Sequence, residues 1–327
     1  MLPWHAAIWQ FLWQRKVKAQ LPHALLFTGV SGVGKQHIAN QFLTSLLCIN
    51  PDQIGEACGY CRHCCLIKAG NHPDVLRVSP EEVGQRIKID AIRKVTAFVN
   101  ETALLGGYRV ILMDPAHAMN HNAANALLKT LEEPTPQVLL LLVTEHPSRL
   151  PLTITSRCQR VLFSCPAHDM ATAWLKEALP SSLTTGSDLT LLLRLADHAP
   201  LKAKDMLEKG VLKTRHDLYQ LLTELSQKKR DPLQCATLCQ DNNTEILLSL
   251  LMSWLMDLMR YKITQANLIN TDYQAIVTVL SKKLSYPKLL RYMDHVQTLY
   301  AHTLHSIHLN SALLIEDLFI RWVQLCS

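Results

Sequence analysis

The sequence predicts an α/β domain built on a parallel sheet, followed by a region made of helices alone. Over about the first 165 residues, short apolar runs alternate with segments of helical spacing, and after Pro166 the apolar runs stop. A glycine-rich stretch directly follows the first run. Continuous apolar strands separated by helices are typical of a parallel sheet covered on both faces, and a glycine-rich turn between strand and helix is typical of nucleotide-binding domains.

Five apolar runs are the expected strands of this sheet. They cover residues 24–29, 74–80, 108–114, 137–144 and 159–166. Helical spacing follows the glycine-rich stretch and returns at about 89–102. A further helix is expected to begin at an asparagine cap, Asn120 or Asn122, and to end before Pro134.

The remainder of the chain is predicted to be helical. We expect a few short helices over about 167–205 and, from about 210 onward, long helices near 217–229, 245–261 and 286–305. The predicted domains are therefore 1–166, 167–208 and 209–327. The apolar stretch 246–259 is too short to span a bilayer and carries Asp257, so we expect a buried helix there. Cys235 and Cys239 are expected in the same core.

Composition limits the class of protein. The 327 residues are 48% hydrophobic, which favours a folded globular chain, and the net charge of +6 is mildly basic. The basic residues are spread along the chain, and the densest run is only "KKR" at 228–230, so a dedicated nucleic-acid groove is not indicated. Since the first residues lack the pattern of a signal peptide, a cytoplasmic protein without a membrane partner is expected.

The stretch "GVSGVGKQ" predicts a degenerate phosphate-binding loop. Gly29, Gly32 and Gly34 would let backbone N–H groups surround phosphate oxygens, and Lys35 would add a positive charge. The usual pattern ends in Ser or Thr, whose hydroxyl holds Mg²⁺, but here Gln36 follows the lysine. ATP binding is therefore expected to be weak or absent. The alternative is a tight strand-to-helix turn with an incidental lysine.

A second acidic motif agrees with a loss of catalysis. Asp114 ends the run "VILMD", the position of a magnesium-coordinating aspartate at a strand end. Hydrolysing proteins of this class place next a glutamate that orients the attacking water, and here the next residue is Pro115. His117 is an alternative for that role. Two changes in one site predict that intrinsic ATP hydrolysis is absent.

Four cysteines predict a structural zinc site. Cys58, Cys61 and Cys64 recur at intervals of three, and Cys48 lies ten residues upstream. Four thiolates at such spacing can close the tetrahedral shell of one Zn²⁺, which gives a zinc module at about 48–65. A redox dithiol pair fits a cluster of this size poorly, and the remaining alternative is that these cysteines pack as small apolar residues. Cys65 replaces Cys48 only awkwardly, because adjacent side chains diverge.

These motifs together resemble the delta-prime family of bacterial DNA polymerase III clamp-loader subunits. The resemblance rests on "HALLFTGVSGVGK", the cysteines followed by "HPDVLRV", "NALLKTLEEP" and "LPLTITSRCQ", and covers about residues 20–165. It implies an AAA+ module, a small helical lid and a C-terminal helical collar that joins five subunits in a ring. It also implies delta and tau/gamma subunits as partners and, through the assembly, the sliding clamp and primed DNA.

Within the clamp-loader subunits, two readings compete. The motor subunits, tau or gamma, keep the Lys-Ser/Thr and Asp-Glu pairs, whereas this chain has Gln36 and Pro115. The resemblance therefore implies a non-hydrolysing, stator-like subunit of the DNA-directed DNA polymerase holoenzyme. The alternatives are a catalytically active, tau/gamma-like ATPase, or a free-standing zinc-dependent nucleic-acid-binding protein.

Arg157, in "TSRCQ", takes a specific role from this resemblance. Taken alone, an arginine there is more simply a salt-bridging residue. In clamp loaders the arginine of the Ser-Arg-Cys motif reaches the γ-phosphate bound by a neighbouring motor subunit. Arg157 is therefore expected to be an arginine finger that acts in trans, because a guanidinium stays charged and donates two hydrogen bonds in one plane.

Overall fold

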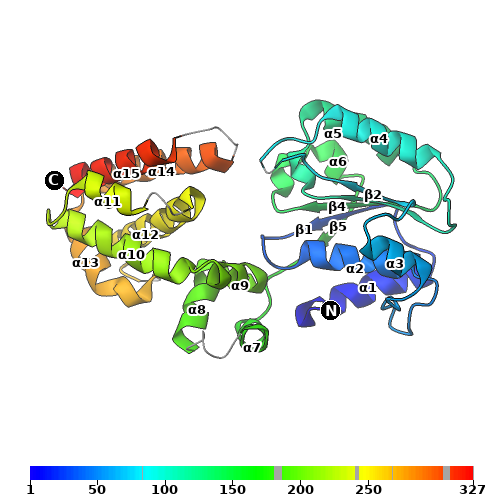
Figure 1. The fold of residues 1–327 in the computed structure, drawn as a ribbon, viewed down its shortest axis with the longest axis horizontal. Helices are drawn as coiled ribbons and strands as arrows, with labels where there is room; N and C mark the ends of the chain where they lie inside the picture. The colour runs from blue at the N-terminus through cyan, green and yellow to red at the C-terminus, as the bar shows by residue number, and fades with distance from the viewer. Residues whose placement is uncertain (83, 180–185, 240–242, 267, 305–309, 327) are drawn as a thin grey trace. The chain divides into compact units, whose positions relative to one another are not determined.

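The computed structural model describes residues 1–327 except 83, 180–185, 240–242, 267, 305–309 and 327. The chain forms two compact units (Figure 1). Unit 1 comprises Met1–Ala178 and His198–Lys202, and unit 2 comprises Leu179–Asp197 and Ala203–Ser327. The predicted division into three domains with boundaries near 166 and 208 stays a prediction.

Unit 1 is built on a five-stranded sheet in the order β2-β3-β4-β1-β5, in which every neighbouring pair is parallel. Its strands are β1 (Ala24–Thr28), β2 (Val75–Val78), β3 (Arg109–Met113), β4 (Val138–Thr144) and β5 (Gln159–Leu162). All five expected strands are present. The last one ends at Leu162, before the predicted 166, because its partner β1 ends at the paired residue Thr28.

Helices cover both faces of this sheet, as Figure 1 shows. The unit contains α1 (Ala6–Val17), α2 (Lys35–Leu47), α3 (Arg62–Lys68), α4 (Ile89–Asn100), α5 (His121–Glu132), α6 (Leu152–Thr155) and α7 (His168–Ala178), with 3₁₀ turns η1 (Pro3–His5), η2 (Ala116–Ala118) and η3 (Pro147–Arg149). Along β1, Leu25 and Phe27 face the core formed with α1 and α2, whereas Leu26 faces the core formed with α4 and α5. Between the two proposed caps, Asn120 is the one used: its side chain accepts a hydrogen bond from Ala123 N, 2.8 Å away.

Among the residues that the structure describes, unit 2 consists of helices and their connecting turns, without a strand. Its helices are α8 (Gly186–Leu195), α9 (Pro200–Glu208, whose first residues belong to unit 1), α10 (Val211–Ser226), α11 (Pro232–Cys239), α12 (Thr244–Thr264), α13 (Gln274–Lys283), α14 (Tyr286–Leu304) and α15 (Ser311–Cys326), with the 3₁₀ turn η5 (Thr271–Tyr273). Helix α12 contains the apolar stretch 246–259, and Trp254 within it is fully buried against Tyr219. Cys235 and Cys239 are buried in the same core, as expected. The predicted fold class is confirmed.

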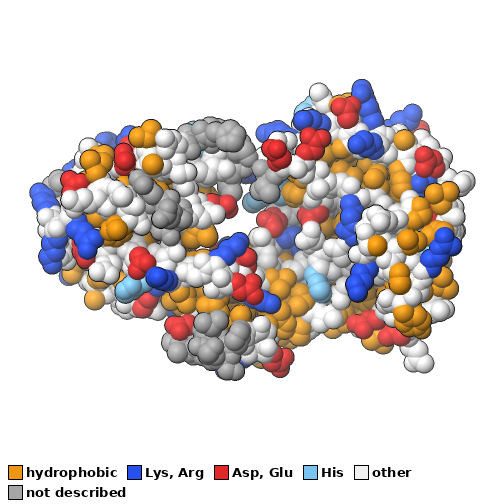
Figure 2. All heavy atoms as spheres, viewed as in Figure 1, with side chains coloured by type: hydrophobic (Ala, Val, Ile, Leu, Met, Phe, Trp, Pro, Cys, Tyr) orange, Lys and Arg blue, Asp and Glu red, His pale blue; other side chains and the backbone are white. Residues whose placement is uncertain are grey.

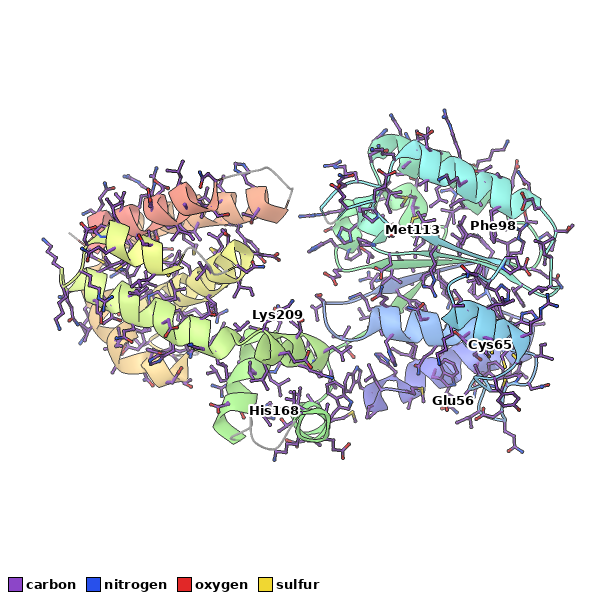
Figure 3. The ribbon with its side chains drawn as sticks, in the orientation of Figure 1. Glu56, Cys65, Phe98, Met113, His168 and Lys209 are labelled. Carbon is purple, nitrogen blue, oxygen red and sulfur yellow. The ribbon has the colours of Figure 1, made fainter. Side chains whose placement is uncertain are left out.

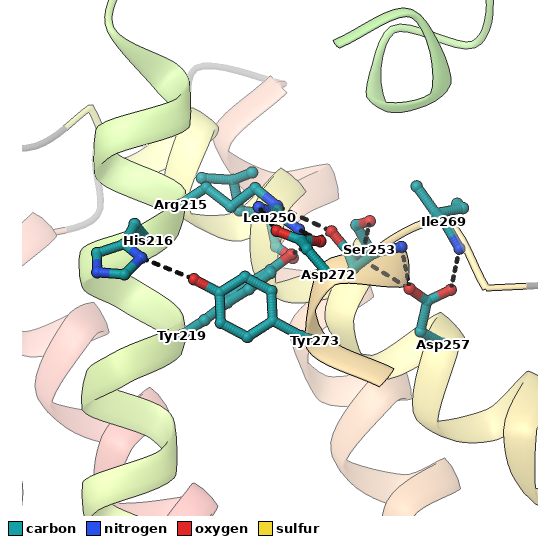
Figure 4. Close-up of polar contacts among 10 residues, drawn as sticks. Arg215, His216, Tyr219, Leu250, Ser253, Asp257, Ile269, Asp272 and Tyr273 are labelled. Atoms are coloured by element: carbon teal, nitrogen blue, oxygen red, sulfur yellow. Dashed lines mark hydrogen bonds and ion pairs between the residues drawn. The ribbon is translucent and has the colours of Figure 1, made fainter. Parts of the chain in front are cut away.

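A buried polar network joins three elements of unit 2 (Figure 4). The guanidinium of Arg215 donates to Asn270 Oδ1 at 2.9 Å and to both carboxylate oxygens of Asp272, at 2.8 and 2.6 Å. Asp257, which is fully buried, accepts from Ile269 N at 2.9 Å and from the backbone and side-chain nitrogens of Asn270, both at 2.7 Å. This network fixes the start of η5 against α10 and α12.

No helix within the described ranges is long and apolar enough to cross a membrane. On the face drawn in Figure 2, basic and acidic side chains are interspersed over both units.

Candidate phosphate site and cysteine cluster

The glycine-rich loop lies between β1 and α2, and its backbone conformation depends on glycine. Gly34 is the N-cap of α2 with φ of +93°, and a Cβ there would lie 2.7 Å from side-chain atoms of both His5 and Leu2. Gly32 has φ of +78°, and its Cβ would lie 2.4 Å from the Cβ of Lys202. The start of α9 therefore packs directly on the loop, where Leu201 N donates to Gly32 O at 3.0 Å.

The loop borders a cavity at the carboxyl ends of the strands. The strand order brings together the residues that follow β1, β4 and β3, which is where open parallel sheets bind ligands. The cavity has a volume of about 440 Å³ and is lined by Ser31, Gly32, Gly34, Lys35, Gln36, His37, Asn40, Asp114, Val143, Glu145 and Leu201. The structure thus brings Gly32, Gly34, Lys35 and Asp114 to one cavity. Gly29, also a predicted site residue, directly follows β1 with its own Cβ position blocked by Phe163.

Lys35 is the buried cation of this cavity. Its side chain is 4% exposed, and its Nζ donates to Val30 O at 2.7 Å and lies 3.8 Å from Glu145 Oε1. Burial lowers the pKa of Lys35, and the negative charges of Glu145 and Asp114 oppose that shift. Among the described residues, the ammonium group therefore has one carbonyl and one carboxylate as near neighbours, and Lys35 lines the cavity.

The acidic side of the cavity differs from that of a complete hydrolytic site. Asp114 directly follows Met113, the last residue of β3, which Figure 3 labels. Burial and, to a smaller extent, the charge of Glu145 raise the pKa of Asp114 to about 6, although the positive charge of Lys35 opposes this shift. Gln36 lines the cavity with an exposed side chain, in the place of the usual hydroxyl.

Pro115 and His117 are outside the described lining of the cavity. Pro115 precedes the turn η2, and His117 lies within it. The Nδ1 atom of His117 is 3.0 Å from Thr144 Oγ1, and burial, followed by the neighbouring His146, lowers the pKa of the imidazole. His117 is thus held by β4 and has no contact with the loop among those described, so its alternative role as a water-orienting group gains no support.

Glu145 was missed by the sequence analysis. It directly follows β4, as Asp114 follows β3, so a carboxylate at the end of a buried strand was the signal that could have found it. Glu145 lies outside the two contiguous ATPase motifs that contain Lys35 and Asp114. Its position beside Lys35 depends on β4 lying next to β1 in the sheet.

The four predicted zinc ligands come together. Their Sγ atoms all lie within 4.8 Å of one another, with 3.5 Å between Cys48 and Cys58 and 4.0 Å for two other pairs. Cys48 ends α2, Cys61 is the N-cap of α3 and Cys64 lies in the first turn of α3. Tetrahedral zinc with four thiolates at about 2.3 Å requires sulfur separations of about 3.8 Å, so these donors fit such an ion.

The surroundings of the cysteine cluster also suit a cation. Backbone N–H groups of Cys58 and Cys61 donate to sulfur atoms of Cys48 and Cys58, at 3.3 and 3.4 Å. Although burial raises the pKa of the Cys61 thiol, hydrogen bonds from the backbone at Cys64 and Ile49 bring it to about 6. Burial raises the pKa of Cys64 well above its ordinary value, and the nearby thiols of Cys61 and Cys48 add to this. Four thiols at this distance resist joint ionisation unless a cation is present.

Cys65 stands apart from this cluster. It is exposed on α3, where Figure 3 labels it, and its thiol contacts Tyr60 O at 3.4 Å. Cys65 is therefore excluded as a replacement for Cys48 in the set of four neighbouring sulfur atoms that the described residues form.

A chain of buried imidazoles connects the cysteine cluster to the sheet. Asp74 N donates to His72 Nδ1 at 3.1 Å, so the proton of His72 is on Nε2, which lies 2.9 Å from His63 Nδ1. His63 directly precedes Cys64, and the carboxylate of Asp74 accepts from the backbone N–H groups of Leu104 and Leu105 at 2.7 and 2.9 Å. The "HPD" that follows the cysteines thus anchors them to the segment before β3.

Arg157 lies on the surface of unit 1, two residues after the end of α6. Its side chain is 37% exposed, and its guanidinium lies 2.8 Å from Glu132 Oε1 and donates to Thr153 O at 3.0 Å. It is absent from the described lining of the cavity in its own chain. An exposed guanidinium with a single surface carboxylate can exchange that partner at low cost.

Comparison with known proteins agrees with this arrangement. Residues 4–167 match the family described as "DNA polymerase III, delta subunit", and residues 209–324 match "DNA polymerase III, delta subunit, C terminal". The delta-prime subunit of DNA polymerase III from Pseudomonas aeruginosa is 36% identical over 99% of this chain and 97% of its own length. The Escherichia coli delta-prime subunit is 32% identical over 91% of this chain and 88% of its own length.

Two further comparisons cover proteins related to the tau/gamma subunit. The tau/gamma subunit of Haemophilus influenzae is 39% identical over 42% of this chain and 20% of its own length. A solved DNA polymerase III gamma-subunit-related protein from Thermotoga maritima covers 97% of this chain with 18% identity and a TM-score of 0.45. Since the delta-prime relatives match over nearly their full length, this chain belongs to the delta-prime subunit family of the bacterial DNA polymerase III clamp loader.

Proposed function

We propose that this chain is a non-hydrolysing, stator-like subunit of the clamp loader that helps to load the sliding clamp onto primed DNA. One observation carries the proposal: the phosphate loop keeps its glycine conformations and its lysine, while Gln36 and Pro115 occupy the two positions on which hydrolysis depends. An amide oxygen on a long side chain is a poor replacement for the hydroxyl that completes the tight octahedral shell of Mg²⁺. Proline has no group that accepts a proton.

The active, tau/gamma-like reading would need another carboxylate to orient water. Glu145 is a carboxylate beside the loop, but its near neighbour is the ammonium of Lys35 at 3.8 Å. A base paired with the phosphate-binding lysine is poorly placed to accept a proton from water. The proposal therefore assigns no intrinsic ATPase activity to the chain.

Arg157 supplies the catalytic contribution in this proposal. It acts in trans on ATP bound by a neighbouring tau/gamma subunit, and its exposure and its single surface carboxylate support that role. Delta and tau/gamma are the proposed direct partners in the ring. The helical region of about 209–327 is proposed to form the collar through which the subunits assemble.

The cysteine cluster has a structural role in this proposal. Cys48, Cys58, Cys61 and Cys64 would hold one Zn²⁺, which supplies a closed, four-thiolate cross-link and no chemistry. These cysteines join the end of α2 to the start of α3, and His63 and His72 connect the cluster to the sheet.

ATP turnover by the isolated chain tests the central claim. We expect the rate of phosphate release with Mg²⁺ to equal that of a Lys35→Ala variant, since no competent site exists. The matched control is the same preparation after a further purification step, which must leave the rate unchanged. Turnover that survives purification and disappears in Lys35→Ala would favour the tau/gamma-like alternative.

A further inference from the structure

The phosphate cavity already contains an anion of the protein itself. Glu145 reaches Lys35 from the end of β4, with 3.8 Å between Oε1 and Nζ. Lys35 is more than nine-tenths buried, and its other contact is the neutral carbonyl of Val30. The charged groups that face the ammonium from the packed elements are therefore Glu145, from β4, and Asp114, from β3.

In a phosphate loop the lysine ammonium binds phosphate oxygens. A carboxylate oxygen is an acceptor of the same kind and charge sign. We propose that Glu145 is an internal counter-ion that takes the place of a nucleotide phosphate on Lys35, so that this one side chain, rather than the shape of the loop, disfavours nucleoside polyphosphates. The inference deepens the proposed function, because it names what keeps the retained loop from holding a nucleotide.

The shape of the cavity supports this assignment. The glycine conformations that let backbone N–H groups approach a phosphate are present, and α2 begins at the loop with its N-terminus toward the cavity. The volume of about 440 Å³ is within the usual range for small-ligand sites. What opposes an incoming polyphosphate is charge, since Glu145 and Asp114 outnumber the one ammonium.

The carboxylates of Glu145 and Asp114 also interact electrostatically with each other. Glu145 contributes to the raised pKa of Asp114, which indicates that their charges share one region of the cavity. A diphosphate would bring at least two more negative charges into this region. Neutralising Glu145 should therefore relieve repulsion and free Lys35 in one step.

Titration of the full-length chain with the fluorescent nucleotide mant-ADP tests the proposal. EDTA is present throughout, so that the missing magnesium ligand at Gln36 has no influence. Glu145→Gln should bind mant-ADP about tenfold more tightly than the parent chain, an order of magnitude expected for one partly screened charge near 4 Å. Inorganic pyrophosphate should compete, because the phosphate contacts carry the gain, and Lys35→Ala should abolish the gain in the Glu145→Gln background.

Glu133→Gln is the matched control. Glu133 is an exposed carboxylate at the C-terminal end of α5, so its neutralisation makes the same change in net charge away from the cavity. Its affinity for mant-ADP should equal that of the parent chain. Glu145→Ser is a second variant, and the thermal midpoint of each ligand-free protein establishes that it is folded.

The proposal is overturned if folded Glu145→Gln and Glu145→Ser both bind no more tightly than the parent chain. It is also overturned if Glu133→Gln gains as much affinity as Glu145→Gln. Hydrolysis is measured separately with Mg²⁺ on the parent chain. Absence of turnover there supports the non-hydrolysing function whatever the affinity of Glu145→Gln, whereas turnover there refutes that function and leaves the counter-ion to be decided by the binding data.

Discussion

Two buried cations, Arg215 in unit 2 and Lys35 in unit 1, have opposite surroundings. Both side chains are almost fully buried, at 3% and 4% exposure. The guanidinium of Arg215 donates to Asn270 and to both oxygens of Asp272 and packs against two tyrosine rings. Lys35 has one carbonyl at hydrogen-bond distance and one carboxylate at 3.8 Å, beside a cavity.

The difference separates a structural charge from a charge that faces a ligand site. Removing an ion from water costs several kcal/mol, which only good geometry and further hydrogen bonds offset. For Arg215, the chain itself supplies the compensating groups. For Lys35, the chain leaves room for a ligand oxygen. The four clustered thiols and Arg157 resemble Lys35 in this respect, because each is proposed to bind a group that the chain itself does not supply: a zinc ion and the phosphate of a neighbouring subunit.

The largest effect on stability is expected at the cysteine cluster, where the proposed zinc ion is the cation that compensates four thiolates. Cys64→Ser should reduce bound zinc from one per chain to well below one, and amide hydrogen exchange should then show loss of protection over residues 48–65. Structural zinc contributes on the order of 10 kcal/mol to small modules that depend on it. The helices of unit 2 should keep their protection.

Cys65→Ser is the matched control for the zinc prediction, because Cys65 is adjacent in sequence and exposed. Its zinc content, measured by elemental analysis, should equal that of the parent chain. A parent chain with well under one zinc and four freely titratable thiols would show that these cysteines form only an apolar cluster.

Arg157 is a third cation to compare with Arg215 and Lys35. Its partner in this chain is Glu132, and its second proposed partner is ATP bound by a neighbouring subunit. Arg157→Ala should leave folding and ring assembly intact and slow ATP hydrolysis at the one site it faces by roughly 10³–10⁵-fold. Single-turnover ATPase of the reconstituted clamp loader measures this, since other sites dominate the bulk rate. Arg157→Lys should restore little, because an ammonium cannot make the bidentate contact.

A control separates this role from bracing within unit 1. Glu132→Gln removes the partner of Arg157 in the same chain and should leave single-turnover hydrolysis unchanged. If Arg157→Ala instead lowers the melting temperature of the free subunit and leaves the assembled ring at full rate, the arginine only supports its own domain.

The two buried cations should differ in their effect on stability. Arg215→Ala leaves Asp272 and the buried Asn270 without their partner, so the free energy of unfolding should fall by about 3–5 kcal/mol. Lys35→Ala should cost about 1 kcal/mol or less, because Glu145 is exposed and regains water. Guanidinium chloride unfolding followed by circular dichroism compares them, and equal losses would refute the distinction drawn here.

Titration of His5 should change the stability with pH, by less than the loss expected for Arg215→Ala. Its Nε2 is 2.9 Å from Val33 O, its buried Nδ1 has no hydrogen-bond partner among the described residues, and burial lowers the pKa of the imidazole to about 4. Because the folded state binds this proton less well than the unfolded state, the contribution to stability is complete above pH 6.5 and is lost as pH falls toward 4.

The change at pH 4 should be roughly 2–3 kcal/mol relative to pH 7. His5→Gln does not titrate and should remove this part of the pH dependence, which denaturant unfolding between pH 4 and 7 measures. A pH profile that is identical in the two proteins would show that His5 does not titrate in this range.

The positions of strands and helices along the chain were easier to predict from the sequence than the contacts between them. Apolar runs located all five strands, because strands buried on both faces leave continuous hydrophobic segments. Helix α10 begins at Val211, which agrees with the expectation of helices from about 210 onward but is six residues before the 217 given for the first long segment. The cysteine ligand set was predictable because its members lie close together along the chain.

Contacts between distant segments were not predictable in this way. Glu145 meets Lys35 only because β4 lies next to β1, and hydrophobic periodicity carries no information on strand order. Likewise, Arg215 meets Asp272 across 57 positions of sequence, and no local pattern marks that pair. Gln36 and Pro115, the two residues on which the proposed lack of hydrolysis depends, were found because they depart from a contiguous motif.

The hydrogen bond between His63 and His72 makes the cysteine cluster observable by spectroscopy. Because Asp74 N–H fixes the tautomer of His72, the ring nitrogens of both histidines have defined protonation, and their ¹⁵N chemical shifts should be well separated. His63 is next to Cys64 in the chain, so occupation of the thiolates changes the electric field at its ring. Selective isotope labelling of histidine would thus report metal occupancy inside the intact multi-subunit ring, without removing a single ligand.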